Sequence, residues 1–322
     1  MLYLTSREIN QIGIDWSKTI QIIENAVHLL NKNDYDQPIK PYLTFDNPSN
    51  RIIAMPARGG GDLSMAGIKW ISSFPNNIEQ GLKRAHSITV LNDDQTGIPF
   101  SIINSSLVSG IRTASVSGLI LSKYMENREN QNLIIGILGF GPIGQLHLEM
   151  VEELLNNQVS KVILYDIRGV NKTLVPESIN GKVEIVQTWV EAYENSDIFI
   201  TCTTSSKGYI SKKPKQGSLL LNVSLREFSS DILDYTQTHI VDNWDEVCRA
   251  NTDIEIFHQE RNFQKEDTFS IVDVVCNQDI SAYPENKSIM FHPMGMALFD
   301  LAISKYYYDQ ALENNIGVML SD

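Results

Sequence analysis

The feature that most constrains the fold is a glycine-rich turn near the middle of the chain. Gly139, Gly141 and Gly144 have the spacing G-x-G-x-x-G, with Pro142 and Ile143 between the last two glycines. In such a turn the first glycine permits a tight bend, the second lets a ligand approach the backbone, and the third lets a helix pack closely on a strand. The turn therefore predicts a helix N-terminus whose backbone N–H groups can receive a diphosphate.

The residues around this turn strengthen the interpretation. An apolar run at 133–138 precedes it, and apolar residues at helical spacing follow at 145–154. A second apolar run ends at Asp166, about 20 residues after the last glycine, where the dinucleotide fingerprint places an acid on the adenosine ribose. Asp166 and its neighbour Ile167 are therefore predicted to contact the cofactor. A carboxylate there favours NAD over NADP, while nearby Arg168 leaves NADP open.

Further apolar runs alternate with helical or turn segments through the second half of the chain, which predicts an α/β fold with a Rossmann, doubly wound parallel sheet. Ligands of such sheets lie beyond the carboxyl ends of the strands, so Thr201, Cys202, Thr203 and Ser224 are predicted at the cofactor. The alternative is that these small polar residues are ordinary loop starters. The expected strands are 133–138, 162–165, 183–186, 198–202, 219–223 and 240–241.

The first third of the chain has a different texture. We expect a helix over 16–31, a helix over 110–124 and short strands at 51–55, 66–71 and 87–91, with a hairpin turn at 92–97. A chain of 322 residues is long enough for two domains. The polar stretch 125–132 is the predicted boundary, and a helix after Pro293 is expected to pack back on the first domain. We thus predict a second α+β domain at 1–126 with 293–322, and an NAD-binding domain at 127–292.

Composition excludes several classes of function. A net charge of −13 argues against nucleic-acid binding, which needs a basic face. No secretory signal or membrane-length apolar run is visible, and three widely spaced cysteines fit a reducing compartment, so we expect a cytoplasmic protein that binds no membrane. The six histidines show no zinc-binding spacing, and we predict no metal.

Several short motifs occur together with the glycine turn, at 51–56, 67–69, 91–97, 112–114 and 295–297. In these motifs, their order and their approximate spacing the chain resembles the ornithine cyclodeaminase and mu-crystallin family over nearly its whole length. Within that family it looks most like the siderophore-pathway branch, through segments that include 37–43, 67–70, 201–203 and 293–297.

The resemblance implies roles for individual residues. Lys69 and Arg112 would hold the α-carboxylate of a substrate, and Lys40 takes a position often held by Arg. Arg51 and Met55 are further substrate-site candidates, and Arg51 has the alternative of being a solvated surface charge. Lys69 lies in an apolar strand, where an unpaired charge is costly. Among other cations it should have a lowered pKa and can polarise the reacting centre.

The resemblance also implies residues at the cofactor and a catalytic acid. Arg112, Thr113 and Gly295 would lie near the cofactor. Glu227 stands at the position where most relatives carry Asp, five residues after the Asn that ends a strand, and would act as the base. Its extra methylene moves the carboxylate by roughly one bond length, which matters where small misplacements cost rate.

The resemblance implies that the domain at 1–126 with 293–322 binds the substrate and pairs two chains into a homodimer. The branch implies an NAD-dependent oxidation. Its substrate is a secondary amine that joins the α-carbon of glutamate to the β-carbon of a diaminopropionate unit, and its products are 2-oxoglutarate and L-2,3-diaminopropionate. Other activities in the same fold stay open: ornithine cyclodeamination, ketimine reduction, alanine dehydrogenation, or NAD binding without catalysis, because a fold does not fix a reaction.

Overall fold

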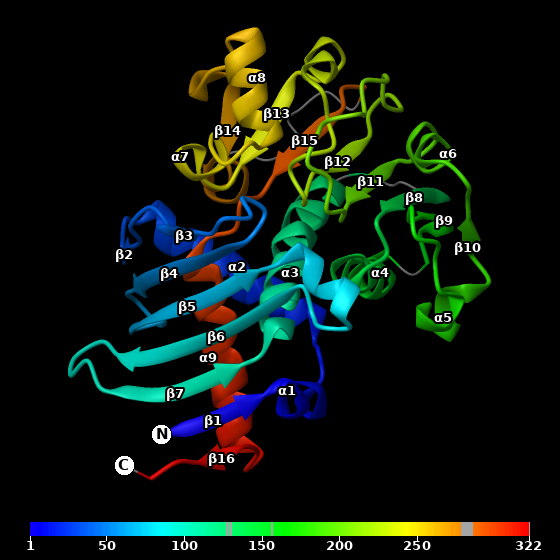
Figure 1. Cartoon of the computed structure of the whole chain (residues 1–322). Coiled ribbons are helices and arrows are strands. Elements are labelled where there is room, and N and C mark those ends of the chain that lie inside the picture. The colour runs from blue at the N-terminus through cyan, green and yellow to red at the C-terminus, as the bar shows by residue number, and fades with distance from the viewer. Residues whose placement is uncertain (127, 129–130, 156, 278–285, 322) are drawn as a thin grey trace. The chain divides into compact units, whose positions relative to one another are not determined.

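The computed structural model describes residues 1–126, 128, 131–155, 157–277 and 286–321 (Figure 1). The chain divides into two compact units, residues 1–112 with 295–322 and residues 113–294. The division falls within helix α3 (Ser106–Met125) rather than at the predicted 126/127. The reason is physical, because one continuous helix carries the chain from the first unit into the second. Residues 127 and 129–130 of the predicted linker lie outside the described residues.

The first unit contains an eight-stranded sheet with the order β16-β1-β7-β6-β5-β4-β2, in which β3 also pairs with β4. Strands β4 to β7 form an antiparallel meander, and β1 runs parallel to β7. The predicted turn at 92–97 joins β6 to β7, with Asp93 N–H donating to the Ile98 carbonyl at 2.9 Å. The strands are β1 (Leu2–Thr5), β2 (Tyr35–Asp36), β3 (Tyr42–Thr44), β4 (Arg51–Gly59), β5 (Met65–Ser73), β6 (Ala85–Asp93), β7 (Pro99–Asn104) and β16 (Val318–Met319).

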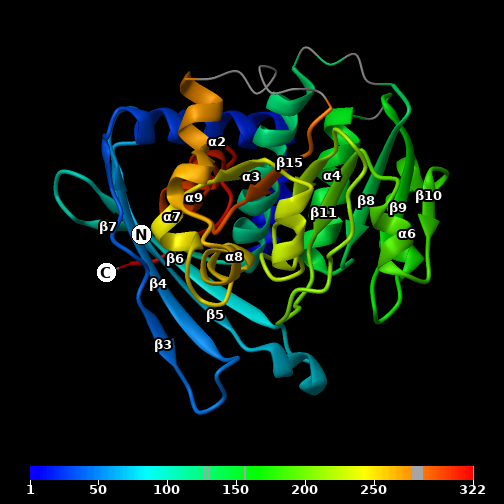
Figure 2. The same ribbon diagram turned by 90° about the horizontal axis from the view of Figure 1, so that it is seen from above.

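Helices cover one face of this sheet (Figures 1 and 2). They are α1 (Ser6–Ile12), α2 (Trp16–Asn31) and α9 (Ala297–Glu313), and α9 contacts β4, β5, β6 and α2. Helix α2 matches the predicted helix, and its N-terminus is capped by Asp15, which accepts a hydrogen bond from Lys18 N–H at 2.8 Å. The prediction that the C-terminal helix packs on the first unit is also confirmed.

The second unit is built on a sheet of eight parallel strands with the order β10-β9-β8-β11-β12-β15-β13-β14. From β8 the order runs outward through β9 and β10 on one side and through β11 and β12 on the other, as in a doubly wound Rossmann sheet, and β15 is inserted between β12 and β13. The predicted fold class is thus confirmed. The strands are β8 (Leu133–Leu138), β9 (Val159–Tyr165), β10 (Val183–Ile185), β11 (Ile198–Thr201), β12 (Leu219–Leu221), β13 (Thr238–Val241), β14 (Thr268–Ser270) and β15 (Ile289–His292).

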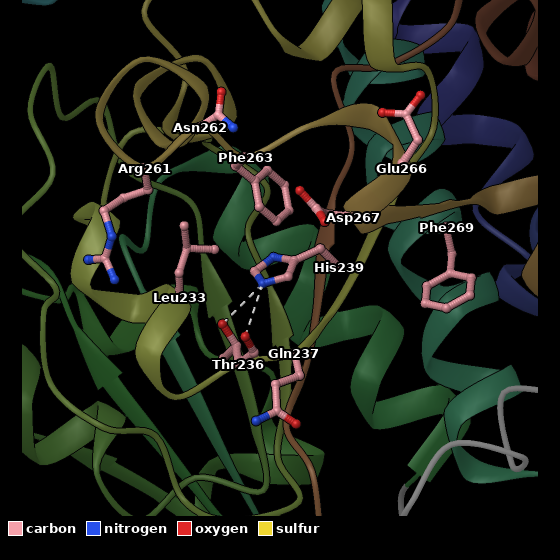
Figure 3. A pocket seen from close by; sticks show the side chains of 10 residues that line it. All are labelled: Leu233, Thr236, Gln237, His239, Arg261, Asn262, Phe263, Glu266, Asp267 and Phe269. Atoms are coloured by element: carbon pink, nitrogen blue, oxygen red, sulfur yellow. Dashed lines mark hydrogen bonds between the residues drawn. The ribbon is translucent and has the colours of Figure 1, made fainter.

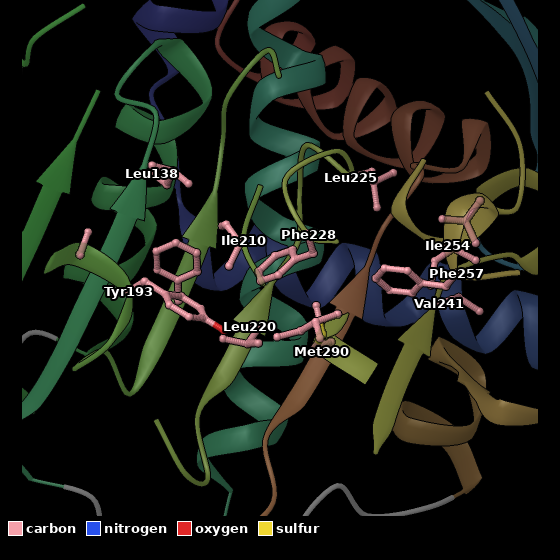
Figure 4. Close-up of a cluster of buried hydrophobic side chains, with 14 of the residues drawn as sticks. Leu138, Tyr193, Ile210, Leu220, Leu225, Phe228, Val241, Ile254, Phe257 and Met290 are labelled. Carbon is pink, nitrogen blue, oxygen red and sulfur yellow. The ribbon is translucent and has the colours of Figure 1, made fainter. Parts of the chain in front are cut away.

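A cluster of buried apolar side chains forms the core of the second unit (Figure 4). Leu138 of β8, Leu220 of β12 and Met290 of β15 belong to it. So do Leu225 and Phe228, which lie on either side of Glu227 and anchor the turn that carries this acid. The α-helices of the unit beyond α3 are α4 (Pro142–Leu155), α5 (Glu177–Asn180), α6 (Trp189–Tyr193), α7 (Trp244–Val247) and α8 (Asp253–Arg261).

Some element boundaries differ from the sequence prediction. Helix α3 begins at Ser106 rather than at 110, because the Ser105 hydroxyl accepts a hydrogen bond from Leu107 N–H at 3.2 Å and caps an earlier first turn. Strand β12 ends at Leu221 rather than at 223, because Val223 N–H turns back to the Leu221 carbonyl at 3.1 Å. Strands β1, β2, β3, β14, β15 and β16 lie outside the predicted ranges, as does β7, which follows the predicted hairpin turn.

Candidate active site

The glycine-rich turn joins β8 to α4. A side chain at Gly144 would have its Cβ 2.1 Å from the Gly139 carbonyl oxygen, so only glycine lets the helix approach the strand this closely. Gly139 has a φ of 91°, and a Cβ there would lie 2.6 Å from the Cys202 carbonyl oxygen. A Cβ at Gly141 would meet no atom within 4 Å. Gly139 and Gly144 are therefore packed tightly against the protein backbone, whereas the space beside Gly141 is open. This open space fits the approach of a diphosphate.

Asp166 follows β9 directly and lies beside this turn. One of its carboxylate oxygens accepts a hydrogen bond from Phe140 N–H at 2.9 Å, and the other accepts one from Arg168 N–H at 2.9 Å. The Arg168 guanidinium is 3.7 Å from the same carboxylate, and the side chain of Ile167 is 85% exposed. Asp166 is thus fixed against the turn, where a Rossmann acid meets a ribose.

The predicted small polar residues gather at the carboxyl ends of β11 and β12. The Thr201 hydroxyl donates to the Asn222 side-chain carbonyl at 3.2 Å. Thr203 N–H donates to the Ser224 hydroxyl at 3.1 Å. Because a Cβ at Gly139 would touch Cys202, these strand ends are immediate neighbours of the glycine turn.

Glu227 is fully buried in the turn after β12. Its carboxylate accepts a hydrogen bond from the Thr203 hydroxyl and one from Arg226 N–H at 3.1 Å. The turn holds Leu225 at a φ of 64°, a left-handed conformation that costs a bulky residue about 1–3 kcal/mol. The surrounding core and a 2.7 Å hydrogen bond from Asp253 N–H to the Leu225 carbonyl keep it in place.

Asp253 is a buried acid beside Glu227 that the sequence did not reveal. Its carboxylate accepts hydrogen bonds from the Asn222 side-chain amide at 2.9 Å and from Phe228 N–H at 3.2 Å. Burial, together with the charge of Glu227, raises the pKa of Asp253 to about 7. Asp253 lies in the first turn of helix α8, just after the N-cap Thr252. Acids are common at that position because they favour the helix N-terminus, so nothing in the sequence marks Asp253 as a site residue.

A buried cluster of charges lies in the first unit. The Lys69 ammonium, on β5, is 2.7 Å from an Asp300 carboxylate oxygen and donates to the Ser109 hydroxyl at 3.0 Å. The Arg112 guanidinium donates to the same Asp300 oxygen at 3.0 Å. Lys69, Arg112 and Asp300 are all buried, so two cations share one carboxylate away from water.

Two further predicted residues belong to this cluster. The Lys40 ammonium is buried and donates to the Gly295 carbonyl at 2.8 Å. Met55, on β4, is buried and lies directly opposite Lys69 in the strand register. A Cβ at Gly295 would lie 2.4 Å from the Arg112 guanidinium, so the glycine leaves room for that side chain.

Asp300 was also missed from the sequence, although a signal for it exists. It is the one charged residue in the run 297–303, on a helix stripe that is otherwise apolar and buried. A lone acid in such a stripe indicates a buried partner of opposite charge. Burial would raise its pKa, but Arg112 and Lys69 outweigh that effect and lower it. Among the described residues, nothing hydrogen-bonds to its second carboxylate oxygen.

The pKa of Lys69 is lowered from 10.5 to about 8. The direction agrees with the sequence prediction, but the main cause is burial rather than neighbouring cations. Asp300 opposes the shift, and Arg112 and Lys40 add to it. Because the folded protein releases this proton more readily than the unfolded chain, the destabilising effect of burying Lys69 is largest below pH 8 and is relieved as the pH rises from about 8 to 10.5.

We expect NMR of the protein labelled at the lysine Cε to show a lysine resonance that titrates near pH 8. The Lys69→Met variant should lack this resonance. In Asp300→Asn the resonance should move to lower pH, because the negative partner that favours the ammonium is gone. Titration of every lysine at the ordinary value would contradict the assignment.

The remaining predicted residues are Thr113, Arg51 and Cys202. Thr113 follows Arg112 in α3, and Arg51 begins β4, four residues before Met55. The sequence showed no base beside Cys202, but the structure places His147 Nδ1 3.8 Å from its sulfur. That nitrogen also bonds the Ile143 carbonyl at 2.8 Å, and burial raises the pKa of the thiol, so Cys202 is unsuited to act as a nucleophile.

A surface pocket of about 490 Å³ in the second unit is a different feature (Figure 3). Thr236 and Gln237, which precede β13, and Glu266 and Asp267, which precede β14, line it. It therefore lies at the amino ends of these strands, whereas Rossmann sheets bind ligands beyond the carboxyl ends. Arg261 in its wall is already paired with Asp234.

The part of the chain that the structure describes contains neither a metal-binding cluster nor a membrane-spanning helix. No group of three His, Cys, Asp or Glu side chains in this part of the chain is arranged to hold a metal ion. In the same residues, no helix has the length and apolar character needed to cross a membrane.

The fold and these contacts define a class: a protein with a Rossmann unit whose glycine turn fits a dinucleotide, and with a second unit that buries a cluster of cations. Comparison with known families is more specific. Residues 4–315 match the ornithine cyclodeaminase/mu-crystallin family model, and the chain belongs to this family.

Individual relatives resemble the whole chain. It is 31% identical to N-((2S)-2-amino-2-carboxyethyl)-L-glutamate dehydrogenase of Staphylococcus aureus, over 100% of this chain and 98% of that protein. It is 25% identical to the alanine dehydrogenase of Archaeoglobus fulgidus, over 98% and 97% of the two chains. The solved Δ1-pyrroline-2-carboxylate reductase of Thermococcus litoralis, in complex with NADH and L-proline, is 24% identical with a TM-score of 0.88, over 99% of this chain and 100% of that one.

Proposed function

We propose that this protein is an NAD-dependent amino acid dehydrogenase that acts on a CH–NH bond. As its reaction we propose oxidative cleavage of N-((2S)-2-amino-2-carboxyethyl)-L-glutamate to L-2,3-diaminopropionate and 2-oxoglutarate, for siderophore or related biosynthesis. The observation that carries the proposal is the buried cluster of Lys40, Lys69 and Arg112, in which Lys69 and Arg112 share a single acid, Asp300. Two cations on the one carboxylate of Asp300 leave an excess of positive charge that suits a substrate carboxylate. The similarity to the S. aureus dehydrogenase supports this choice of substrate.

In this proposal the first unit binds the substrate. Lys69 and Arg112 hold an α-carboxylate, because the planar fork of Arg suits bidentate binding and Lys69 adds a point charge. Lys40 takes a second carboxylate, and Met55 lines the apolar part of the site. The Lys69 ammonium, whose pKa is about 8, also polarises the reacting carbon and can exchange a proton near neutral pH.

The second unit holds the cofactor and the acid. Gly139, Gly141 and Gly144 accommodate the diphosphate, Asp166 binds the adenosine ribose, and Thr201, Thr203 and Ser224 line the nicotinamide side. NAD, when bound, accepts the hydride from the glutamate α-carbon. Glu227 accepts the amine proton as the carbon–nitrogen double bond forms and returns it to the imine nitrogen, so that its carboxylate can then take a proton from the water that adds to the imine carbon. Cleavage of that carbon–nitrogen bond leaves the keto group on 2-oxoglutarate and the amine on diaminopropionate.

A substrate panel tests the proposal. Purified protein is mixed with NAD and the secondary amine, and the absorbance of NADH is followed while 2-oxoglutarate is measured in the same samples. We expect equal amounts of NADH and 2-oxoglutarate. Turnover of L-alanine, or consumption of L-ornithine, with none of the secondary amine, would replace this reaction with one of the other family activities. A protein inert toward every amino and imino acid would be a binding protein.

Replacement of Asp166 should change the choice of cofactor. In Asp166→Ser the ribose hydroxyls lose a charged acceptor, while Arg168 stays available for the 2′-phosphate of NADP. We expect affinity for NADH to fall by roughly tenfold and affinity for NADPH to rise, measured by quenching of protein fluorescence. The double variant Asp166→Ser/Arg168→Ser is the control and should lose the gain in NADPH affinity. An unchanged preference in Asp166→Ser would contradict the assigned role.

We also propose that the protein is a cytoplasmic homodimer formed through the sheet of the first unit. Trp70 and Ile88 are directly opposite each other on β5 and β6 and are 41% and 40% exposed. An apolar sheet face of this kind is typical of subunit contacts. Among the described residues, Cys202, Cys248 and Cys276 are not joined by a disulfide, which supports a reducing compartment. Light scattering by the purified protein tests the dimer, and a monomer at all concentrations would exclude it.

A further inference from the structure

We propose that Arg51 and Arg84 form a second anion subsite in the first unit, which binds the substrate carboxylate farthest from Lys69 and Arg112. The inference rests on the proposed function and extends it, because it concerns what the substrate must carry at its other end. It adds Arg84, which no motif of the sequence indicates.

The two arginines meet at one end of the sheet of the first unit. Arg51 is the first residue of β4 and lies opposite Ser73, the last residue of β5. Ser73 in turn lies opposite Ala85, the first residue of β6, so Arg84 directly precedes this point. The Arg84 guanidinium donates to the Ser73 hydroxyl at 3.0 Å. Both guanidinium groups are therefore brought to Ser73 from neighbouring strands.

Neither arginine has an acidic partner among the described residues. Arg51 Nε is buried and has no hydrogen-bond acceptor in this part of the chain. Its guanidinium carbon is 5.9 Å from the ring centre of Tyr42. Burial lowers the pKa of Arg84, and the charge of Arg51 lowers it further, so the two cations repel each other without compensation.

Other arginines of the chain have a carboxylate partner that compensates their charge. Arg58, on the same strand as Arg51, is 2.7 Å from an Asp94 oxygen, and Arg249 is paired with Glu246. Two adjacent guanidinium groups with an unsatisfied buried N–H are unfavourable unless an anion joins them. A carboxylate suits this place, because the guanidinium fork matches its two oxygens.

The subsite lies on the same face of the sheet as the charge cluster. Lys69 and Ser73 are four residues apart on β5, and side chains at even spacing point to the same face. At about 3.3 Å per residue, the two positions are roughly 13 Å apart along the strand. Side chains that reach toward each other shorten this span. A substrate with carboxylates at both ends can bridge it, whereas alanine, with one carboxylate, cannot.

The first experiment measures binding and needs no turnover. Calorimetric titration compares glutarate, which has two carboxylates, with butyrate, which has one and a similar length. We expect the parent protein to bind glutarate roughly ten- to hundredfold more tightly than butyrate. Arg51→Met and Arg84→Met should each remove most of this difference. Equal affinity of the parent for the two ligands would overturn the subsite, whatever reaction the protein catalyses.

The second experiment uses the proposed substrate. Arg51→Met and Arg84→Met should raise KM for N-((2S)-2-amino-2-carboxyethyl)-L-glutamate roughly ten- to hundredfold and leave kcat within a few-fold, because the carboxylate is remote from the reacting carbon. Arg58→Met is the matched control, a cation of the same strand whose side chain is 46% exposed, and should behave as the parent. Folded variants with parental KM would refute the subsite. If the parent does not oxidise this substrate, the proposed reaction fails and the glutarate titration alone decides the subsite.

Discussion

Replacement of Glu227 by Gln should abolish measurable turnover and leave dinucleotide binding intact. Gln has nearly the same shape but cannot take a proton, and a positioned acid–base group contributes about 10²–10⁴-fold to rate. The Thr203 hydroxyl can still donate to the amide oxygen of Gln, so the turn should keep its conformation. We therefore expect kcat to fall by about that factor while the affinity for NADH stays within a few-fold of the parent.

Two further variants sharpen this test. Glu227→Asp keeps the acid and should recover part of the rate, because the carboxylate is only displaced. Glu194→Gln removes an exposed acid of the same unit that is paired with Lys212, and it should retain parental activity. If Glu227→Gln keeps more than a tenth of the parental kcat, Glu227 is not the base, and the buried neighbour Asp253 becomes the next candidate.

Replacement of Asp300 by Asn should strongly destabilise the first unit. The variant leaves the Lys69 ammonium and the Arg112 guanidinium buried together with no carboxylate between them. Removal of one member of a buried ion pair costs on the order of 3–5 kcal/mol, because the remaining charge stays away from water. Urea unfolding followed by circular dichroism measures this loss. The loss should be smaller in alkaline buffer, where Lys69 releases its proton.

The same helix offers a control. Asp309 pairs with Lys305 at 2.7 Å, one turn apart on α9, and its side chain is 43% exposed. An exposed pair of this kind contributes about 0.3–0.5 kcal/mol, so Asp309→Asn should unfold at almost the parental midpoint. Equal midpoints for the Asp300 and Asp309 variants would mean that the buried ion pairs of Asp300 contribute little.

The sequence was most informative where backbone geometry depends on residue type. Gly139 and Gly144 stand where any side chain would collide with a backbone carbonyl, so their spacing predicted strand, turn and helix together. The strand that ends just before Asp166, β9, was predicted for the same reason, since the fingerprint joins the turn to the following strand. Local patterns of this kind need no knowledge of the distant chain.

The sequence was less informative where contacts join distant segments. Lys69 and Asp300 are 231 residues apart. The residues around each of them do not show that the two side chains form an ion pair. Asp253 looked like a capping acid, and its approach to Asn222 follows from the order of the parallel strands and the loops between them. Arg84 directly precedes β6, which begins at Ala85, whereas the predicted strand begins at 87. The position of Arg84 beside Arg51 could therefore not be predicted.

The most direct test of the account is a calorimetric titration of the purified protein with NADH and with NADPH. Both the cofactor and the chemistry assigned to the protein depend on the turn from Gly139 to Gly144 receiving a diphosphate. We predict one site per chain, with NADH bound more tightly than NADPH because Asp166 accepts the ribose hydroxyls. Absence of binding by either dinucleotide at millimolar concentration would contradict the account.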